Sequence, residues 1–123
     1  MTTHKSIAES YWRAECARDI DGVLNHYATN AHFVAPGWDL HGHDEIRRYY
    51  EDSASKFPGL EVDVVSDFSS GDFGAVEWDA CLIGPTGVRY PITGVNLITL
   101  RDGLFAEVRA YFDTSKIPHD LDQ

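Results

Sequence analysis

The chain has 123 residues, a formal net charge of -10 at pH 7 and a pI near 4.8. This length is typical of one domain, and a hydrophobic content of 43% is sufficient for a single core, which argues against disorder. Scattered negative charge repels phosphate backbones and anionic lipid, so the composition excludes nucleic-acid binding and membrane docking as functions.

The sequence contains no targeting pattern and no obvious cysteine pair. Its first twelve residues have no long apolar run and no cleavage site, so we expect neither a signal peptide nor a transmembrane segment. Cys16 and Cys81 are far apart and lack CxxC spacing, which predicts two free thiols in a reducing cytoplasm.

The first half of the chain has the apolar spacing of helices. Residues 4–18 predict one helix, and Asp19 is a suitable N-cap for a short second helix that ends near Ala28. A third helix is predicted over about 44–56. Between the second and third helices, an extended piece over 32–35 stops at a Pro-Gly turn.

The second half changes to the period-two pattern of strands, joined by glycine-containing turns. The predicted strands are 60–70, 73–83, 88–100 and 104–112. Helices followed by an antiparallel meander indicate an α+β fold, with the helices packed on one face of the sheet.

The predicted strand 73–83 has two different faces. Alternation alone places Glu77 and Asp79 in water. The strand 88–100 shows little alternation near its middle, which indicates cover on both faces of the sheet. Helices can cover one face, so we expect a second copy of the chain to cover the other and form a homodimer. Its interface is expected to include the apolar face formed by Val76, Trp78, Ala80 and Leu82.

This order of elements is similar to the nuclear transport factor 2-like superfamily. Three strings carry the resemblance: ARDIDGVLNHYATNAHF, GHDEIRRYY and DGLFAEVRAYFD. The branch that the chain resembles most is that of the ketosteroid isomerases and SnoaL-like polyketide cyclases, with limonene epoxide hydrolase more distant. The resemblance implies a cone-shaped curved antiparallel sheet packed against three N-terminal helices. It also implies a deep apolar pocket, a dimer through the outer sheet face and no cofactor.

The resemblance to ketosteroid isomerases also implies hydrogen-bond donors. Their oxyanion-hole tyrosine on the first helix matches Tyr11, and two tyrosines that can extend its hydrogen-bond chain, on the second and third helices, match Tyr27 and Tyr50. Their second donor is an aspartate kept neutral by an apolar site, and its position matches Asn96. An asparagine amide also donates and needs no shifted pKa to do so.

The general base of that family is absent from its usual place. An aspartate just before a proline holds this role, and the matching residue here is Ala35, which cannot move a proton. Asp39, four residues further on, is one candidate to replace it. Glu77 and Asp79 are the others, because the family register turns them and Cys81 toward the pocket. Two carboxylates so close would shift each other's pKa and could divide the roles of acid and base.

The same register predicts the rest of the pocket wall. Trp38 lies where the pocket mouth is expected and could cover a ligand ring, or it could anchor the loop on the first helix. The expected lining residues are Tyr27, Tyr50, Phe33, Ala35, Trp38, Cys81, Tyr90, Ile92, Val108, Ala110 and Phe112.

His41 and His43 stand one residue apart before Asp44, but no HExxH or CxxC spacing accompanies them. This pattern predicts the start of a helix, so we expect no metal ion and no diffusible cofactor.

These features predict a cofactor-independent enzyme that isomerises, cyclises, dehydrates or hydrates a hydrophobic oxygenated small molecule, steroid-like or polyketide-like. Tyr11 and Asn96 would stabilise an oxyanion, and Asp79, Glu77 or Asp39 would move the proton. A non-catalytic binding protein is the first alternative, and a dimeric interaction protein with a filled interior is the second.

Overall fold

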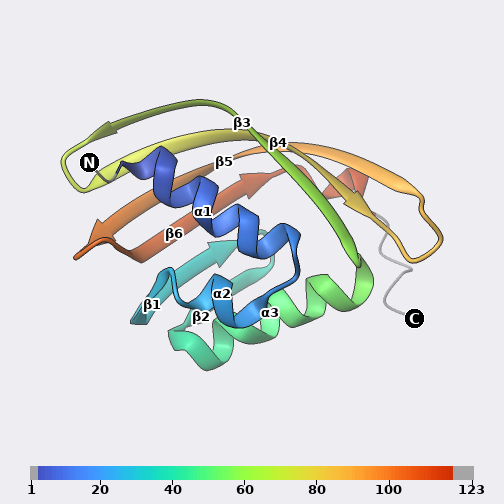
Figure 1. Cartoon of the computed structure of the whole chain (residues 1–123), viewed down its shortest axis with the longest axis horizontal. Helices are drawn as coiled ribbons and strands as arrows, with labels where there is room; N and C mark the ends of the chain where they lie inside the picture. Colours follow the sequence, from blue (N-terminus) through green and yellow to red (C-terminus); the bar gives the residue numbers. More distant parts are fainter. Residues whose placement is uncertain (1–2, 118–123) are drawn as a thin grey trace.

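The computed structural model describes residues 3–117 (Figure 1). The helices are α1 (His4–Cys16), α2 (Ile20–Leu24) and α3 (Gly42–Lys56). The strands are β1 (Tyr27–Ala35), β2 (Trp38–His41), β3 (Gly59–Ser70), β4 (Phe73–Ile83), β5 (Arg89–Arg101) and β6 (Leu104–Phe112). A short 3-10 helix, η1 (Thr114–Lys116), follows the last strand.

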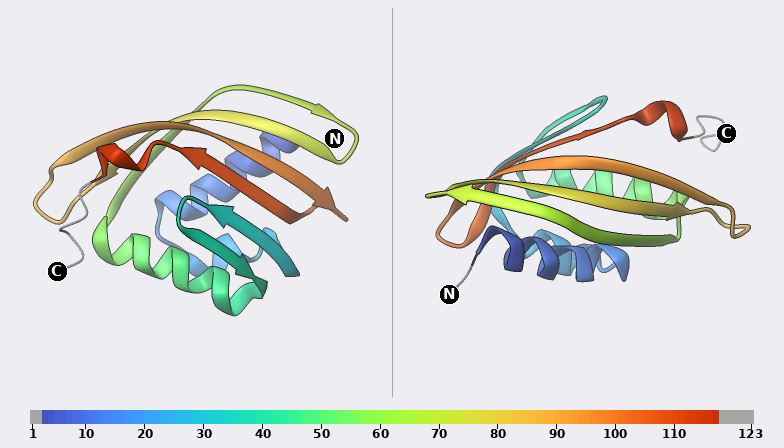
Figure 2. Two further views of the ribbon diagram at one scale, coloured as in Figure 1. Left: turned by 180° about the vertical axis from the view of Figure 1, so that it is seen from behind. Right: turned by 90° about the horizontal axis from the view of Figure 1, so that it is seen from above.

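The six strands form one mixed sheet in the order β2-β1-β6-β5-β4-β3. β3 to β6 make the antiparallel meander that the sequence predicted, while β1 pairs with β6 in parallel and β2 closes the edge. Figures 1 and 2 show a curved sheet with the helices on one side. The predicted α+β fold is confirmed. The side of the sheet that carries the helices is called the inner face below, and the opposite side the outer face.

Local signals explain both ends of α1. A capping box begins it: the Ser6 backbone N–H donates to Thr3 Oγ1 at 3.0 Å, and the Thr3 N–H donates to Ser6 Oγ at 2.9 Å. The helix ends at Cys16, two residues earlier than predicted, and Arg18 then takes a left-handed backbone conformation with φ of 57°. The Arg18 guanidinium donates to the backbone oxygen of Phe57, which ties this turn to the end of α3.

The segment between α2 and α3 is a β-hairpin, where only a short extended piece and a loop were expected. α2 ends at Leu24, so the second helix does not reach Ala28, and Tyr27 starts β1 instead of lying on a helix. The backbone N–H of Phe105 donates to the His26 oxygen at 2.8 Å, which joins this point to β6. Gly37, with φ of 84°, supplies the left-handed residue of the hairpin turn.

The apolar side of β4 faces the core and not a partner. Trp78 and Leu82 are 6% and 8% exposed, and Val76 is fully buried. The prediction that the set Val76, Trp78, Ala80 and Leu82 forms a dimer interface is wrong, because within one chain these side chains already pack against the apolar core.

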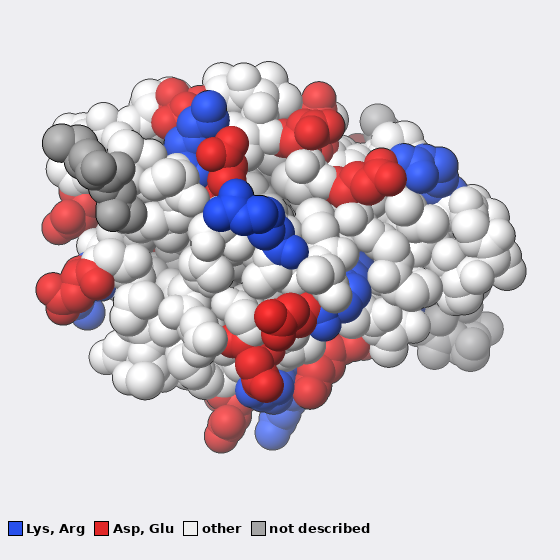
Figure 3. Space-filling model, viewed as in Figure 1, with Lys and Arg blue, Asp and Glu red and all other residues white. Residues whose placement is uncertain are grey.

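Acidic and basic side chains are interspersed on the face of the molecule seen in Figure 3. Among the described residues, no helix is both long and apolar enough to cross a membrane.

Candidate functional site

The inner face of the sheet and the helices enclose a cavity of about 270 Å³. This volume lies just below the range of about 300–1,000 Å³ that is usual for small-molecule sites. Most of the wall is apolar, and its apolar members are Trp12, Phe33, Pro36, Trp38, Phe57, Leu60, Val62, Trp78, Ala80, Leu82, Ile92, Ala110, Phe112 and Ile117. The cavity therefore suits a compact hydrophobic molecule.

Three tyrosines form a chain of hydroxyl groups behind one part of the wall. The Tyr50 hydroxyl lies 2.5 Å from that of Tyr11 and 2.6 Å from that of Tyr27. All three side chains are buried, and Tyr11 is the member of the chain that lines the cavity. Burial raises the pKa of each phenol, so all three stay protonated at neutral pH. Tyr11 thus brings to the cavity wall a neutral phenol that belongs to a chain of hydrogen-bonded hydroxyl groups.

Glu15 lies one helical turn after Tyr11 on α1 and also lines the cavity. Removal from water raises the pKa of its carboxyl group above the ordinary value of 4.5. A hydrogen bond from the Tyr11 hydroxyl and the positive charge of Arg18 act in the opposite direction, but their effects are smaller. Glu15 is therefore a stronger base than a solvated glutamate, held beside the hydroxyl chain.

Asn96 supplies a hydrogen-bond donor from β5, on the sheet side of the cavity. Its side chain is 7% exposed, and its Oδ1 accepts a hydrogen bond of 3.0 Å from the indole N–H of Trp78 on β4. An indole nitrogen only donates, so this contact identifies the amide oxygen and fixes the orientation of the amide. The NH2 group of Asn96 is then left to donate to a ligand in the cavity.

Two charged residues on the last turns of α3 line a more exposed part of the cavity wall. Asp52 and Lys56 line this part and form an ion pair of 3.0 Å, with their side chains 38% and 27% exposed. Tyr11 and Asn96 are 5% and 7% exposed. The charged pair is therefore accessible to solvent, whereas the two donors are buried.

Residues 8–108 match the family of SnoaL-like domains. The chain belongs to this family. The match extends from α1 to β6 and confirms the resemblance that the sequence strings indicated. Among curated proteins the sequence has no match.

Solved structures share the fold of this SnoaL-like domain. An NTF2-like protein of unknown function from Burkholderia pseudomallei K96243 aligns with a TM-score of 0.83 and 18% identity, over 95% of each chain. TerC, co-crystallized with polyporic acid, aligns with a TM-score of 0.82 and 19% identity, over 97% of this chain and 98% of its own. A candidate SnoaL-like polyketide cyclase from Shewanella putrefaciens CN-32 aligns with a TM-score of 0.82 and 14% identity, over 95% of this chain and 84% of its own. At these identities the likeness establishes the fold alone.

The side of β4 that faces the cavity is opposite to the side that the resemblance to the family implied. Trp78 and Leu82 line the cavity, whereas Glu77 and Asp79 are exposed on the outer face. Cys81 is half-buried on that same outer side. The expectation that these three residues face the pocket is wrong, and the simple alternation of the strand gave the correct side.

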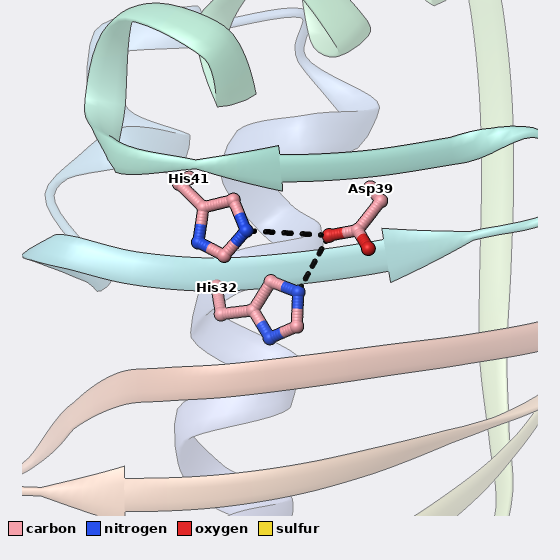
Figure 4. Close-up of side chains that lie close together, drawn as sticks. All are labelled: His32, Asp39 and His41. Carbon is pink, nitrogen blue, oxygen red and sulfur yellow. Dashed lines mark hydrogen bonds and ion pairs between the residues drawn. The ribbon is translucent and has the colours of Figure 1, made fainter.

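Asp39 does not line the cavity, and Figure 4 shows its side chain on the side of the strands opposite to α1. Its side chain is 69% exposed, and its Oδ1 lies 2.6 Å from Nε2 of His32 and 3.5 Å from Nε2 of His41. The loop in which it was expected is strand β2, so consecutive residues face opposite sides of the sheet. Trp38 therefore lines the cavity, and Asp39 next to it does not.

The remaining predicted lining residues divide between the cavity wall and its surroundings. At the wall are Phe33, Trp38, Ile92, Ala110 and Phe112. Buried in the core, and not among the lining residues, are Tyr27, Ala35, Tyr50 and Val108. Tyr90 packs against Phe57, with ring centroids 5.9 Å apart.

Glu15 was not among the predicted site residues. The signal that could have identified it is its spacing of four residues from Tyr11, which places both side chains on one face of α1. Asp52 and Lys56 were missed as well, although their own spacing of four puts them together on α3.

Proposed function

We propose that this SnoaL-like domain is an enzyme of the isomerase, cyclase or dehydratase type that acts on a hydrophobic oxygenated small molecule without a cofactor. The observation that carries the proposal is the pair of Tyr11 and Glu15 at the wall of an apolar cavity. One group can stabilise negative charge and the other can move a proton, which are the two needs of enolate chemistry. The fold shared with a candidate polyketide cyclase supports the same class.

Glu15 is the proposed base. In its ionised form it would remove a proton from a carbon next to a carbonyl group, and in its protonated form it would return that proton elsewhere on the ligand. Burial raises the pKa of Glu15 and so increases its basicity. The position that holds the base in ketosteroid isomerases is Ala35 here, which has no proton to move and does not line the cavity.

Tyr11 and Asn96 are the proposed donors to the carbonyl oxygen on which the negative charge develops. If Tyr27 donates to Tyr50 and Tyr50 to Tyr11, the Tyr11 proton remains free to donate onward. Before proton transfer it donates to the ionised Glu15. Once Glu15 is protonated, the Tyr11 hydroxyl can turn to the ligand oxygen. The hydrogen bond of Tyr11 would thus follow the negative charge from Glu15 to the ligand.

Proton abstraction can be tested before the natural substrate is known. The protein is incubated in D2O with steroid enones and polyketide-like aromatic ketones that carry enolisable C–H bonds next to a carbonyl group. NMR then follows the loss of C–H signals next to each carbonyl group. We expect catalysed exchange on at least one compound, and its loss in Glu15→Gln.

Asp79→Asn is the matched control, because it removes a carboxylate from the exposed outer face. Exchange that survives in Glu15→Gln would refute the assignment of the base. If no compound shows catalysed exchange, the proposal that the protein is an enzyme of this type is contradicted.

A non-catalytic binding protein is the second candidate, and the alanine at position 35 favours it. In this case the mainly apolar cavity would hold a polyketide-like or lipid-like ligand without reaction. A thermal-shift screen with the same compounds separates the two candidates, because a bound ligand raises the unfolding temperature whether or not it reacts. A ligand that shifts the unfolding temperature without C–H exchange would support the binding protein. If no compound shifts it, both pocket functions fail and an interaction protein remains.

We also propose a homodimer through the outer face of the sheet, with different contact residues from those first expected. Phe68, Phe73 and Tyr111 lie on strands of this sheet and are 75%, 50% and 52% exposed. Their register neighbours Ala75 and Val95 share the outer side with Glu77. Large apolar side chains gathered on one face are typical of an interface.

Sedimentation of the double variant Phe68→Glu/Tyr111→Glu tests this interface. We expect the wild type to be a dimer at micromolar concentration and the double variant to be a monomer. Val88→Glu is the control, since Val88 is 49% exposed but lies in the turn between β4 and β5. A wild type that sediments as a monomer would contradict the proposed homodimer.

A further inference from the structure

Four polar side chains meet on the outer face near the edge of the sheet, and Figure 4 shows three of them, His32, Asp39 and His41. His32 on β1 is opposite His41 in the antiparallel pair with β2 and opposite Glu107 in the parallel pair with β6. Asp39 precedes His41 by two residues, so both point to the same side of β2. Two imidazole groups from one hairpin thus align with a carboxylate from β6, which is distant in the sequence.

The side-chain atoms of three of these residues converge. Nε2 of His32 lies 2.6 Å from Oδ1 of Asp39, and Nε2 of His41 lies 3.5 Å from the same oxygen. The two imidazole rings are stacked, with centroids 4.4 Å apart and planes within 5°. One ligand atom from each residue lies within 4.8 Å of the other two. Two imidazoles and a carboxylate are a common ligand set for transition metals.

We propose that His32, Asp39 and His41 bind a late first-row divalent cation, for which Zn²⁺ and Ni²⁺ are suitable probes. Imidazole nitrogen favours such ions, whereas Mg²⁺ and Ca²⁺ require more oxygen ligands than one carboxylate provides. Three protein ligands leave a coordination position for water. The site is separate from the cavity, because these side chains project from the opposite face of the sheet.

The spacing of the ligand atoms suits such an ion. Two bonds of about 2.0–2.2 Å at a tetrahedral angle separate the ligand atoms by about 3.3–3.6 Å. His41 and Asp39 are already 3.5 Å apart. The 2.6 Å hydrogen bond between His32 and Asp39 must lengthen by about 1 Å as the cation replaces its proton. Asp39 can make this movement because its side chain is 69% exposed. His41, which is 68% exposed, must also rotate out of the stack, because two parallel rings cannot both direct their in-plane lone pairs at one ion.

Glu107 provides the outer contact that metal-binding histidines usually have. Nδ1 of His32 lies 3.0 Å from Oε2 of Glu107, and Arg109 Nε donates to the other Glu107 oxygen at 3.1 Å. A histidine ligand typically donates its second ring N–H to a carboxylate, which orients the ring and fixes its tautomer. This contact directs Nε2 of His32 toward Asp39 and the cation. The sequence had paired His41 with His43, whereas the hairpin pairs it with His32.

Isothermal titration calorimetry on the untagged chain tests the site. Titration with Zn²⁺, and separately with Ni²⁺, should give one ion per chain, and Mg²⁺ should not bind. Asp39→Asn and His41→Gln each remove a ligand and should weaken binding more than about tenfold. Glu107→Gln should weaken it by about 10–100-fold, as is usual for outer contacts.

His43→Gln is the matched control. This histidine lies two residues from His41, but its Nε2 contacts the backbone oxygen of Tyr27, so the substitution should leave zinc affinity unchanged. The proposal is overturned if the wild type does not bind zinc or nickel at submillimolar concentration. It is equally overturned if binding persists unchanged in both Asp39→Asn and His41→Gln.

Discussion

The two sides of the sheet give the same chemical group opposite properties. On the inner side, burial raises the pKa of Glu15, while on the outer side a hydrogen bond from His32 lowers the pKa of Asp39. One carboxyl group lines a mainly apolar cavity, and the other meets water and a basic ring. The inner group is suited to carry a proton and the outer group to remain charged, as a metal ligand must. The side of the sheet thus decides the chemistry of the carboxyl group.

The largest expected effect comes from replacing a carboxyl group by an amide on each side of the sheet. Glu15→Gln should lower turnover of an identified substrate by about 100-fold or more, because a positioned base typically contributes 10²–10⁴ in rate. Asp79→Asn on the outer face should leave turnover unchanged. Steady-state rates of the two variants measure the difference. Equal effects of the two substitutions would show that the side of the sheet does not matter.

The next test removes one donor from the inner side. Tyr11→Phe should lower kcat by more than about tenfold, because the hydroxyl that faces the developing negative charge is lost. Tyr90→Phe is the control, since Tyr90 packs against Phe57 and does not line the cavity. A Tyr11→Phe variant with full activity would restrict this tyrosine to a structural role.

A smaller effect is expected from the residue that orients Asn96. Trp78→Phe removes the hydrogen bond to the amide oxygen, so the amide is no longer held in one orientation. We expect a severalfold loss in kcat and a loss of about 1 kcal/mol in stability, or about 4 °C in Tm. Kinetics and thermal unfolding of the same sample separate the two effects. A change in Tm without a change in kcat would remove Asn96 from the donors.

The smallest effect is a difference in stability with pH. The raised pKa of Glu15 means that the folded state holds this proton more tightly than the unfolded state. Its contribution to stability is therefore greatest below its ordinary value of 4.5 and falls as the pH rises through the raised pKa. The unfolding temperature of Glu15→Gln, relative to that of the wild type, should therefore increase as the pH rises above 4.5.

Asp39→Asn should behave in the opposite way. The pKa of Asp39 is lowered, so its contribution is present above the ordinary value of 3.8 and is lost as the pH falls through the lowered pKa. The variant should therefore be less stable than the wild type near neutral pH, and this deficit should shrink in acid. The same sign of pH dependence in both variants would contradict the contrast between the two sides.

Most of the fold was predictable because the responsible signals are local. The helical spacing around Tyr50 and the period-two runs of β4 to β6 lie within single elements, and glycine turns separate them. β2 was missed because four residues, WDLH, carry too little alternation to be read alone. Its formation depends on pairing with β1, and β1 in turn depends on β6, more than seventy residues away.

The site was predictable only in part. Tyr11 and Asn96 were found by matching positions to a family, and the structure places both at the cavity. The same matching assigned Glu77 and Asp79 to the wrong side, because a shift of one residue along a strand reverses every side chain. Glu15 became visible only when the packing of α1 showed which helix face meets the cavity.

The cavity wall also contains every tryptophan of the chain: Trp12, Trp38 and Trp78. Their rings come from α1, β2 and β4 and therefore form different parts of the cavity wall. The tryptophan emission of the unlabelled protein therefore originates entirely at this one site. A molecule that enters the cavity should change this emission, and no tryptophan outside the cavity adds a constant background. Ligand binding can therefore be measured by the intrinsic fluorescence of the protein.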